Sequence, residues 1–163
     1  MKRLLLVLML LLSIFGVAHA EYPAYLNGDP NYPCVGGHMG QGIYLDISSV
    51  KVLEANHPIY KLSYQALSVG DADRGNVYNF TRISGTYLYN TGMHKMYSYY
   101  NGQYNYVPPV GSMADTGHFY PGEFAFYYAF GKRFYGGQKW YNKWSGTYEE
   151  ANCTGLYRML GLE

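Results

Sequence analysis

Charged residues are scarce in this 163-residue chain. They make up 14% of it, and 12 basic residues are almost balanced by 11 acidic ones. A chain with so little net charge has no electrostatic basis for binding nucleic acid or an anionic membrane surface. The composition therefore argues against nucleic acid as a partner.

Cysteine is also sparse, with Cys34 and Cys153 as the two examples. In an oxidising compartment, an even number of cysteines is typical of disulfides. The sequence therefore predicts a Cys34–Cys153 disulfide that ties the N-terminal region to the C-terminal tail. A nucleophilic Cys34 is the alternative, but no neighbouring residue indicates a lowered thiol pKa.

Recognisable catalytic and metal-binding patterns are missing. The chain has neither a nucleophile elbow nor a phosphate-binding loop. Its histidines after residue 20 are too far apart in sequence to pair at metal-ligand spacing. The sequence therefore predicts no metal site, no cofactor and no catalytic residue. A site assembled from distant positions is the alternative.

Only the N-terminus carries a long hydrophobic run, over residues 4–17. Lys2 and Arg3 precede this run, and Ala18 and Ala20 place small residues at the −3 and −1 positions of a cleavage site. This order is typical of a signal peptide, and the run is shorter than the ~20 residues of a membrane-spanning helix. The prediction is a signal peptide over residues 1–20, no stable membrane span after its cleavage, and export to the periplasm, cell surface or medium. An uncleaved anchor is the alternative.

Tyrosine and glycine are abundant, with 21 and 20 residues. Residues 21–42, rich in Pro, Gly and Asn, predict an irregular N-terminal arm. From residue 43 on, apolar and polar residues alternate as in half-buried strands, most clearly over residues 59–69. The alternation changes phase at Ser48-Ser49, which predicts a bulge or a tight turn, and breaks at Ser84-Gly85, which predicts two separate strand pieces.

Asn101-Gly102 is typical of a two-residue hairpin turn, which fixes the strand register. Tyr97 then faces Tyr106, and Tyr99 faces Tyr104, so that four tyrosines share one face. This face either packs on the domain core or is an exposed platform for a glycan, a peptide or a partner protein. We favour the core, because a sheet needs one buried face and the opposite face of this hairpin is mostly polar.

Residues 121–136 have both helical and strand periodicity. Pro121 suits a first helical turn, Glu123 complements a helix N-terminus, and Gly136-Gly137 is a stop signal. The sequence therefore predicts a helix that covers one face of the sheet, with a strand as the alternative. Further on, Trp140 and Trp144 form either an exposed basic-aromatic patch or partly buried anchors.

Three segments carry a resemblance to known proteins: YLDISSVKV at 44–52 followed by IYKLSY, KMYSYY at 95–100, and PGEFAFYYAFGKRFYG at 121–136. Together they resemble a group of small, uncharacterised secreted proteins from diderm Firmicutes of the Selenomonas and Veillonella type. The motif DISSV alone is similar to the first hairpin of surface-adhesin protein E-like domains. The resemblance implies export to the bacterial envelope and assigns no functional residue.

The sequence thus predicts an α+β, mainly β fold: an antiparallel meander of about five strands with one aromatic-rich helix packed on it. Residues 43–163 form a single β-rich domain with a C-terminal helix and tail. The expected function is a non-enzymatic, adhesin-like envelope module that binds a protein or a glycan. The alternative is a secreted hydrolase of wall or extracellular polymer with a dispersed active site. The candidate binding residues are Tyr97, Tyr99, Tyr104, Tyr106, Trp140 and Trp144.

Overall fold

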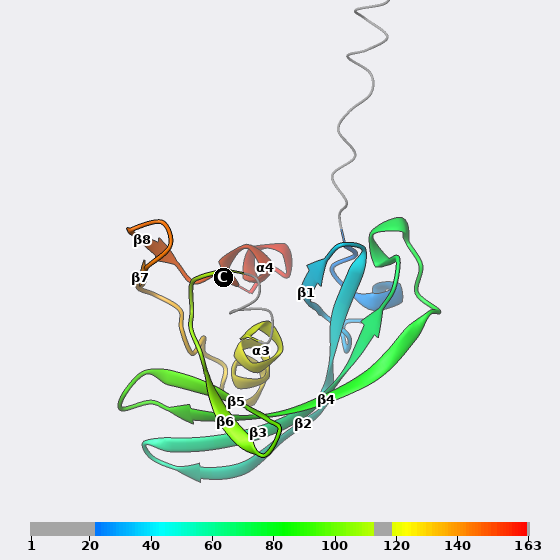
Figure 1. Cartoon of the computed structure of the whole chain (residues 1–163). Helices are drawn as coiled ribbons and strands as arrows, with labels where there is room; N and C mark the ends of the chain where they lie inside the picture. The colour runs from blue at the N-terminus through cyan, green and yellow to red at the C-terminus, as the bar shows by residue number, and fades with distance from the viewer. Residues whose placement is uncertain (1–21, 113–118, 163) are drawn as a thin grey trace, which may run out of the picture.

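A six-stranded antiparallel sheet dominates the computed structural model, which describes residues 22–112 and 119–162. Its strands follow one another in sequence order: β1 (Cys34–His38), β2 (Gln41–Asn56), β3 (Ile59–Val69), β4 (Phe80–Asn90), β5 (Lys95–Tyr100) and β6 (Gln103–Val107). The sheet curls around helix α3 (Phe119–Phe130), as Figure 1 shows. The predicted class, a mainly β meander with an aromatic-rich helix packed on it, is confirmed.

Smaller elements complete the fold. Two 3-10 turns, η1 (Leu26–Gly28) and η2 (Ala72–Arg74), flank the first strands. The tail forms a hairpin of β7 (Lys139–Asn142) and β8 (Thr147–Glu150), followed by helix α4 (Thr154–Met159). Within the described residues, no helix is long and apolar enough to cross a membrane.

The β2–β3 pair confirms the clearest strand and the predicted bulge. β3 has the predicted bounds, and the register of β2 shifts between Asp46 and Lys51. Asp46 Oδ1 accepts hydrogen bonds from the backbone N–H and the hydroxyl of Ser48, at 3.0 and 2.6 Å. The Ser49 hydroxyl accepts one from the backbone N–H of Gln65 at 2.7 Å. Side-chain hydrogen bonds therefore replace the backbone hydrogen bonds that are missing between β2 and β3, and they fix the bulge in one conformation.

The predicted break at Ser84-Gly85 is wrong, because β4 runs through both residues. Gly85 lies opposite Tyr64, and a Cβ on Gly85 would lie only 2.6 Å from the Tyr64 ring. The glycine therefore serves the close approach of an aromatic ring to the strand rather than an interruption.

The N-terminal arm is also more regular than predicted, because Cys34–His38 is strand β1. Val35 enters the main core with no exposed surface. Gly36 and Gly37 lie within a strand where aromatic rings press on the backbone. A Cβ on Gly37 would lie 2.6 Å from the Tyr22 ring. Gly36 and Gly37, which suggest a turn in the sequence, thus lie in a strand. Their lack of a side chain leaves space for aromatic rings to pack on the backbone.

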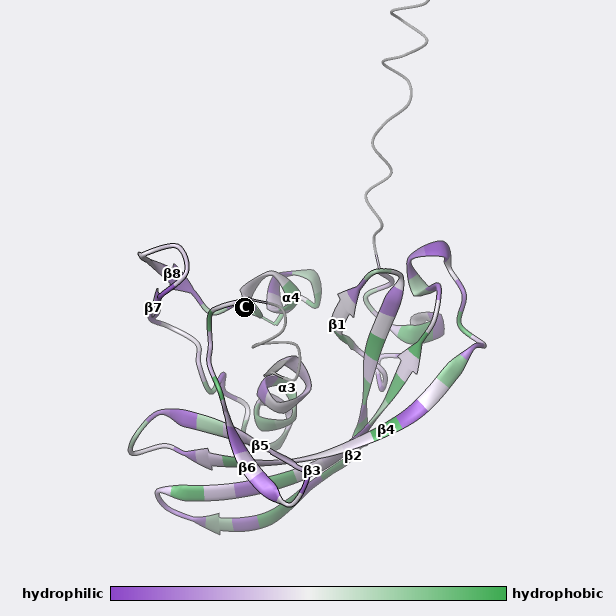
Figure 2. Ribbon diagram, in the orientation of Figure 1, coloured by the Kyte–Doolittle hydropathy of each residue, from purple (hydrophilic) through white to green (hydrophobic). Residues whose placement is uncertain are grey.

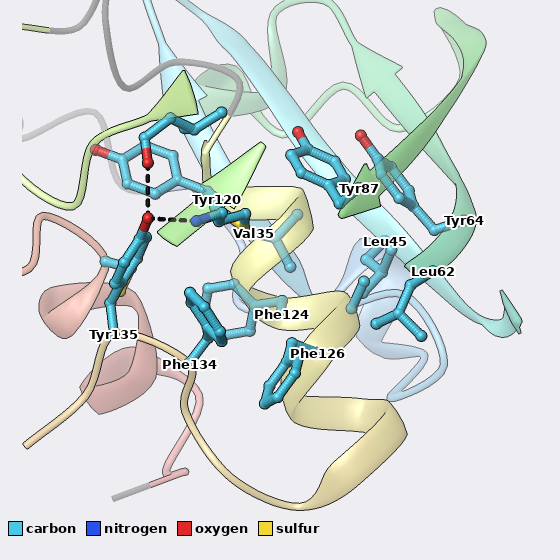
Figure 3. Packing of buried hydrophobic residues seen from close by; sticks show 14 of the residues in the cluster. Val35, Leu45, Leu62, Tyr64, Tyr87, Tyr120, Phe124, Phe126, Phe134 and Tyr135 are labelled. Atoms are coloured by element: carbon cyan, nitrogen blue, oxygen red, sulfur yellow. Dashed lines mark hydrogen bonds between the residues drawn. The ribbon is translucent and has the colours of Figure 1, made fainter. Parts of the chain in front are cut away.

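The main core lies between the concave face of the sheet and α3 (Figures 1 and 3). Phe124 and Phe126 of the helix pack against sheet residues such as Leu45, Leu62 and Tyr89. The predicted helix is confirmed, but it ends at Phe130 rather than at the Gly136-Gly137 stop signal. Gly131 ends it, with a φ of 68° and its N–H donating to the Tyr127 carbonyl at 2.7 Å.

A second cluster covers one end of the opposite sheet face. Leu67 and Val69 of β3 point away from the main core and pack with Tyr44 and with Leu26 of η1. Lys61 and Ser63 point the same way by the strict alternation of β3, but they are only partly buried. Half of this face is therefore covered by the arm, and half is bare. Figure 2 shows hydrophobic and hydrophilic residues alternating along the long strands.

The two cysteines lie in different clusters. Cys34 belongs to the second cluster and Cys153 to the main core, and both are buried free thiols. The structure therefore contains no bond between Cys34 and Cys153, contrary to the prediction. Burial raises the pKa of both thiols, which keeps them protonated.

Candidate functional site

The β5–β6 hairpin forms as predicted. Asn101 and Gly102 both have positive φ angles, 50° and 79°, as a type I′ turn requires. The cross-strand pairs are those predicted, with centroid distances of 5.8 Å for Tyr97–Tyr106 and 5.0 Å for Tyr99–Tyr104. We call this set of four residues the tyrosine platform.

The favoured burial of these tyrosines in the core is wrong. Tyr99 is 49% exposed, Tyr104 38% and Tyr106 47%, and Tyr97 is partly buried. The platform lies on the bare half of the sheet, on the same face as Lys61, whose Nζ lies 5.6 Å from the Tyr104 ring centroid. The hairpin therefore presents the aromatic face as a surface.

The hairpin is anchored from its other face instead. Met96 and Val107 are buried at its base, on the face that carries Ser98 and Asn105 further out. The Tyr135 hydroxyl accepts a hydrogen bond from the Met96 N–H and donates one to the Val107 carbonyl, both at 2.8 Å (Figure 3). The hairpin face that carries the polar Ser98 and Asn105 is thus the one fixed to the core. The tyrosines on the other face therefore remain exposed.

Two lysines border the platform. Lys61 lies over Tyr104, and Lys95 Nζ lies 5.6 Å from the Tyr106 ring centroid. Such cation–π contacts hold the rings in a defined orientation. Hydrogen bonding to Tyr104 raises the pKa of Lys61 above its ordinary value, so this lysine is cationic at neutral pH.

The structure brings the two predicted tryptophans close to the platform. Trp140, Trp144 and Tyr106 line one cavity of about 330 Å³, together with Pro108 and Pro109. Trp144 is 79% exposed, whereas Trp140 is partly buried and donates a hydrogen bond from Nε1 to the Tyr135 carbonyl at 3.2 Å. Trp140 therefore anchors the β7–β8 hairpin, and Trp144 is its exposed aromatic residue.

A polar groove adjoins the platform on the same bare face, and sequence reasoning missed it. It has a volume of about 660 Å³ and crosses β2, β3 and β4 to reach Tyr99 of β5. We call it the serine groove. Hydroxyl-bearing and other polar side chains dominate its lining: Asp46, Ser48, Ser49, Lys51, Ser63, Gln65, Ser84, Thr86 and Tyr99. Only their alternation along four separate strands could have indicated that they share a face.

Glu123 is the second feature that the sequence did not reveal, since it is a buried carboxylate and not a surface helix-capping group. It has no exposed surface. Its Oε1 accepts hydrogen bonds from the Phe134 N–H at 2.9 Å and from the Tyr157 hydroxyl at 3.1 Å, and Oε2 accepts one from the Tyr135 N–H at 3.2 Å. Burial raises its pKa to about 7, although these hydrogen bonds and Arg133 oppose the shift. Glu123 therefore joins α3 to the segment after it and to α4, and substrate cannot reach it.

The described residues offer no cluster of three His, Cys, Asp or Glu side chains that could hold a metal ion. The site thus consists of exposed aromatic rings, lysines and a hydroxyl-lined groove. Comparisons with protein-family models, curated proteins and solved structures found no match for the chain. The resemblance to secreted proteins of diderm Firmicutes and to protein E-like domains stays a prediction.

Proposed function

We propose that this chain is an exported envelope protein that binds an extracellular ligand through the tyrosine platform and performs no catalysis. The main support is the exposure of Tyr99, Tyr104 and Tyr106 on a hairpin whose opposite face is fixed to the core. Tyrosine combines a large apolar ring with a polar hydroxyl and loses little entropy on binding, which suits it to half-wet interfaces. A rigid backbone further reduces the cost of binding.

The hydrolase alternative has weaker support. A hydrolase site needs a carboxylate or a histidine with a tuned pKa in a cleft that substrate can enter. Within residues 22–112 and 119–162, the carboxylate with a raised pKa is Glu123, which has no exposed surface. The serine groove and the cavity beside the tryptophans present mainly hydroxyl groups and aromatic rings, whereas two other pockets are lined by charged side chains or by His94.

Hydrogen exchange on the exported protein, with and without candidate ligands, tests this proposal. The candidates are host-matrix proteins and soluble polysaccharides. A true ligand slows exchange over residues 95–107 and binds at least about tenfold more weakly to a Tyr99→Ser/Tyr104→Ser double variant. The matched control is Tyr78→Ser/Tyr148→Ser, because both are exposed tyrosines and neither lines the serine groove or the cavity beside Tyr106. Equal binding by both double variants would contradict the proposal.

Export is tested separately. The full chain, expressed in a diderm bacterium, is expected in the periplasmic or extracellular fraction with Glu21 as its first residue, by N-terminal sequencing. Alanine-to-leucine changes at Ala18 and Ala20 should block cleavage. An intact N-terminus on membrane-bound protein would support the anchor alternative instead.

A further inference from the structure

The strongest unassigned feature is the serine groove. We propose that the groove and Tyr99 together bind a chain of an uncharged polysaccharide, which the remaining platform tyrosines extend. This inference rests on the proposed binding function and names its ligand class.

The hydrogen-bonding groups of the groove match a polyhydroxylated ligand. Across the described residues, no side-chain hydrogen bond engages the hydroxyls of Ser63, Ser84 or Thr86, or the amide of Gln65. A hydroxyl donates one hydrogen bond and accepts two, and a side-chain amide also donates and accepts hydrogen bonds. Sugar hydroxyls also do both, so they can satisfy this lining in several orientations.

A peptide ligand fits this location less well. Peptides that bind to sheets usually add a strand to an exposed edge, where backbone groups are unpaired. The centre of the groove is instead β3, whose Ser63 and Gln65 pair with β2 on one side and with β4 on the other, so β3 offers no free backbone edge. Its lining therefore offers side chains, and the side chains are mainly hydroxyls.

The rim of the groove is already rigid. The Asp46 carboxylate holds Ser48, and the Ser49 hydroxyl is held by the Asp46 carbonyl at 2.6 Å and the Gln65 N–H. A ligand therefore meets polar groups whose positions are fixed before binding, which limits the entropy lost on association.

Tyr99 supplies an aromatic end to the groove. The faces of pyranose rings carry C–H groups, and an aromatic ring presents a negative face to such groups. The Tyr99–Tyr104 pair is followed by the Tyr97–Tyr106 pair two residues along the strands, a step of about 7 Å. Stacking positions thus continue beyond the groove, as an extended sugar chain requires.

The charges of the groove favour an uncharged chain. Within the groove, one carboxylate, Asp46, balances one ammonium group, Lys51. The two lysines that border the platform, Lys61 and Lys95, lie over the rings of Tyr104 and Tyr106. Salt screens attraction between exposed charges, but it has little effect on stacking and neutral hydrogen bonds. Binding of the polysaccharide should therefore be almost independent of salt.

Affinity electrophoresis and calorimetry on the exported full-chain product test the inference. The probes are laminarin, dextran, arabinoxylan and galactomannan, with hyaluronan as the anionic comparison. We expect at least one uncharged probe to bind, with about tenfold loss for Tyr99→Ser and about 2- to 10-fold loss for Ser63→Val and Thr86→Val. The controls Thr81→Val and Tyr148→Ser, at exposed positions outside the groove, should bind like the parent.

Three results would overturn the inference: no uncharged probe binds, binding is unchanged by Ser63→Val and Thr86→Val, or only hyaluronan binds and is released by salt. The proposed function survives if a protein or an anionic glycan still needs Tyr99 and Tyr104. It fails together with the inference if no ligand distinguishes the platform double variant from its control.

Discussion

Tyrosine serves two opposite purposes on adjacent strands of this sheet. Tyr64, Tyr87 and Tyr89 are buried on the concave face, where the Tyr64 and Tyr87 rings stack 5.8 Å apart (Figure 3). Tyr99 and Tyr104, on the next two strands β5 and β6, pair at 5.0 Å and remain substantially exposed. The same side chain builds the core in one region and an exposed surface in the other.

The difference comes from what each region packs against. The Tyr89 hydroxyl donates a hydrogen bond to the Gly122 carbonyl of α3 at 2.7 Å, and the ring lies 4.9 Å from that of Phe126. Burial raises the pKa of Tyr64 to about 12 and that of Tyr89 well above its ordinary value, so both keep their protons. The platform faces the side of the sheet that α3 does not cover. Density of tyrosine in a sequence therefore does not reveal its purpose, whereas position relative to the helix does.

The largest expected effect is on the buried side of this comparison. Tyr89→Ala removes a ring that contacts Phe126 and Phe134 and leaves the Gly122 carbonyl without its donor. Removal of a buried aromatic side chain costs about 3–5 kcal/mol in the free energy of unfolding. Urea denaturation measures this loss. A cost below about 1 kcal/mol would contradict the role of Tyr89 as a core residue.

The second prediction concerns the buried carboxylate of the same core. The pKa of Glu123 is about 7 in the folded chain and about 4.5 when unfolded, so between these values the folded state binds more protons. Its contribution therefore favours folding at pH below about 4.5 and is lost as the pH rises through 7. The difference of about 2.5 pKa units corresponds to roughly 3 kcal/mol.

Glu123→Gln isolates this contribution. The amide oxygen can still accept hydrogen bonds from the Phe134 N–H and the Tyr157 hydroxyl, but it does not titrate. Unfolding free energies of the parent and of Glu123→Gln are measured between pH 4.5 and 8. Subtracting the values of the variant from those of the parent cancels the contributions of the other titrating groups. The unfolding free energy of the parent minus that of the variant should decrease as the pH rises. A difference that does not change with pH would contradict the raised pKa of Glu123.

A third prediction separates a glycine that packing requires from a glycine with open space around it. Gly85→Ala places a Cβ 2.6 Å from the buried Tyr64 ring, and such overpacking costs about 1–3 kcal/mol. Gly155→Ala is the control, since nothing lies within 4 Å of its Cβ and the residue is in α4, where alanine stabilises by up to ~1 kcal/mol. Thermal unfolding of the two variants should shift in opposite directions. Equal shifts would contradict the close approach of Tyr64.

Local patterns predicted much of the fold. The Asn101-Gly102 turn gave the register of the hairpin because a two-residue loop leaves no freedom of pairing. Alternation gave the bounds of β3, and the change of phase at Ser48-Ser49 located the bulge in β2. These features depend on neighbours in the sequence, so the sequence alone is sufficient for them.

The remaining features depend on distant contacts. The exposed face of the hairpin follows from Tyr135, 39 residues from Met96, which holds the opposite face. The burial of Glu123 follows from partners 11 to 34 residues away. The serine groove collects side chains from four strands. None of these long-range contacts leaves a local signal, so the candidate site was predicted only through its aromatic residues.

The smallest expected effect belongs to the exposed side of the comparison. Tyr99→Ser/Tyr104→Ser removes one cross-strand aromatic pair, which contributes about 0.2–1 kcal/mol to hairpin stability. Because Met96, Val107 and Tyr135 still hold the base of the hairpin, the loss should stay within that range in the urea experiment used for Tyr89→Ala. The same variant is expected to lose ligand binding at least about tenfold. A stability loss above about 2 kcal/mol would mean that these tyrosines support the fold, and the contrast between the two regions would then fail.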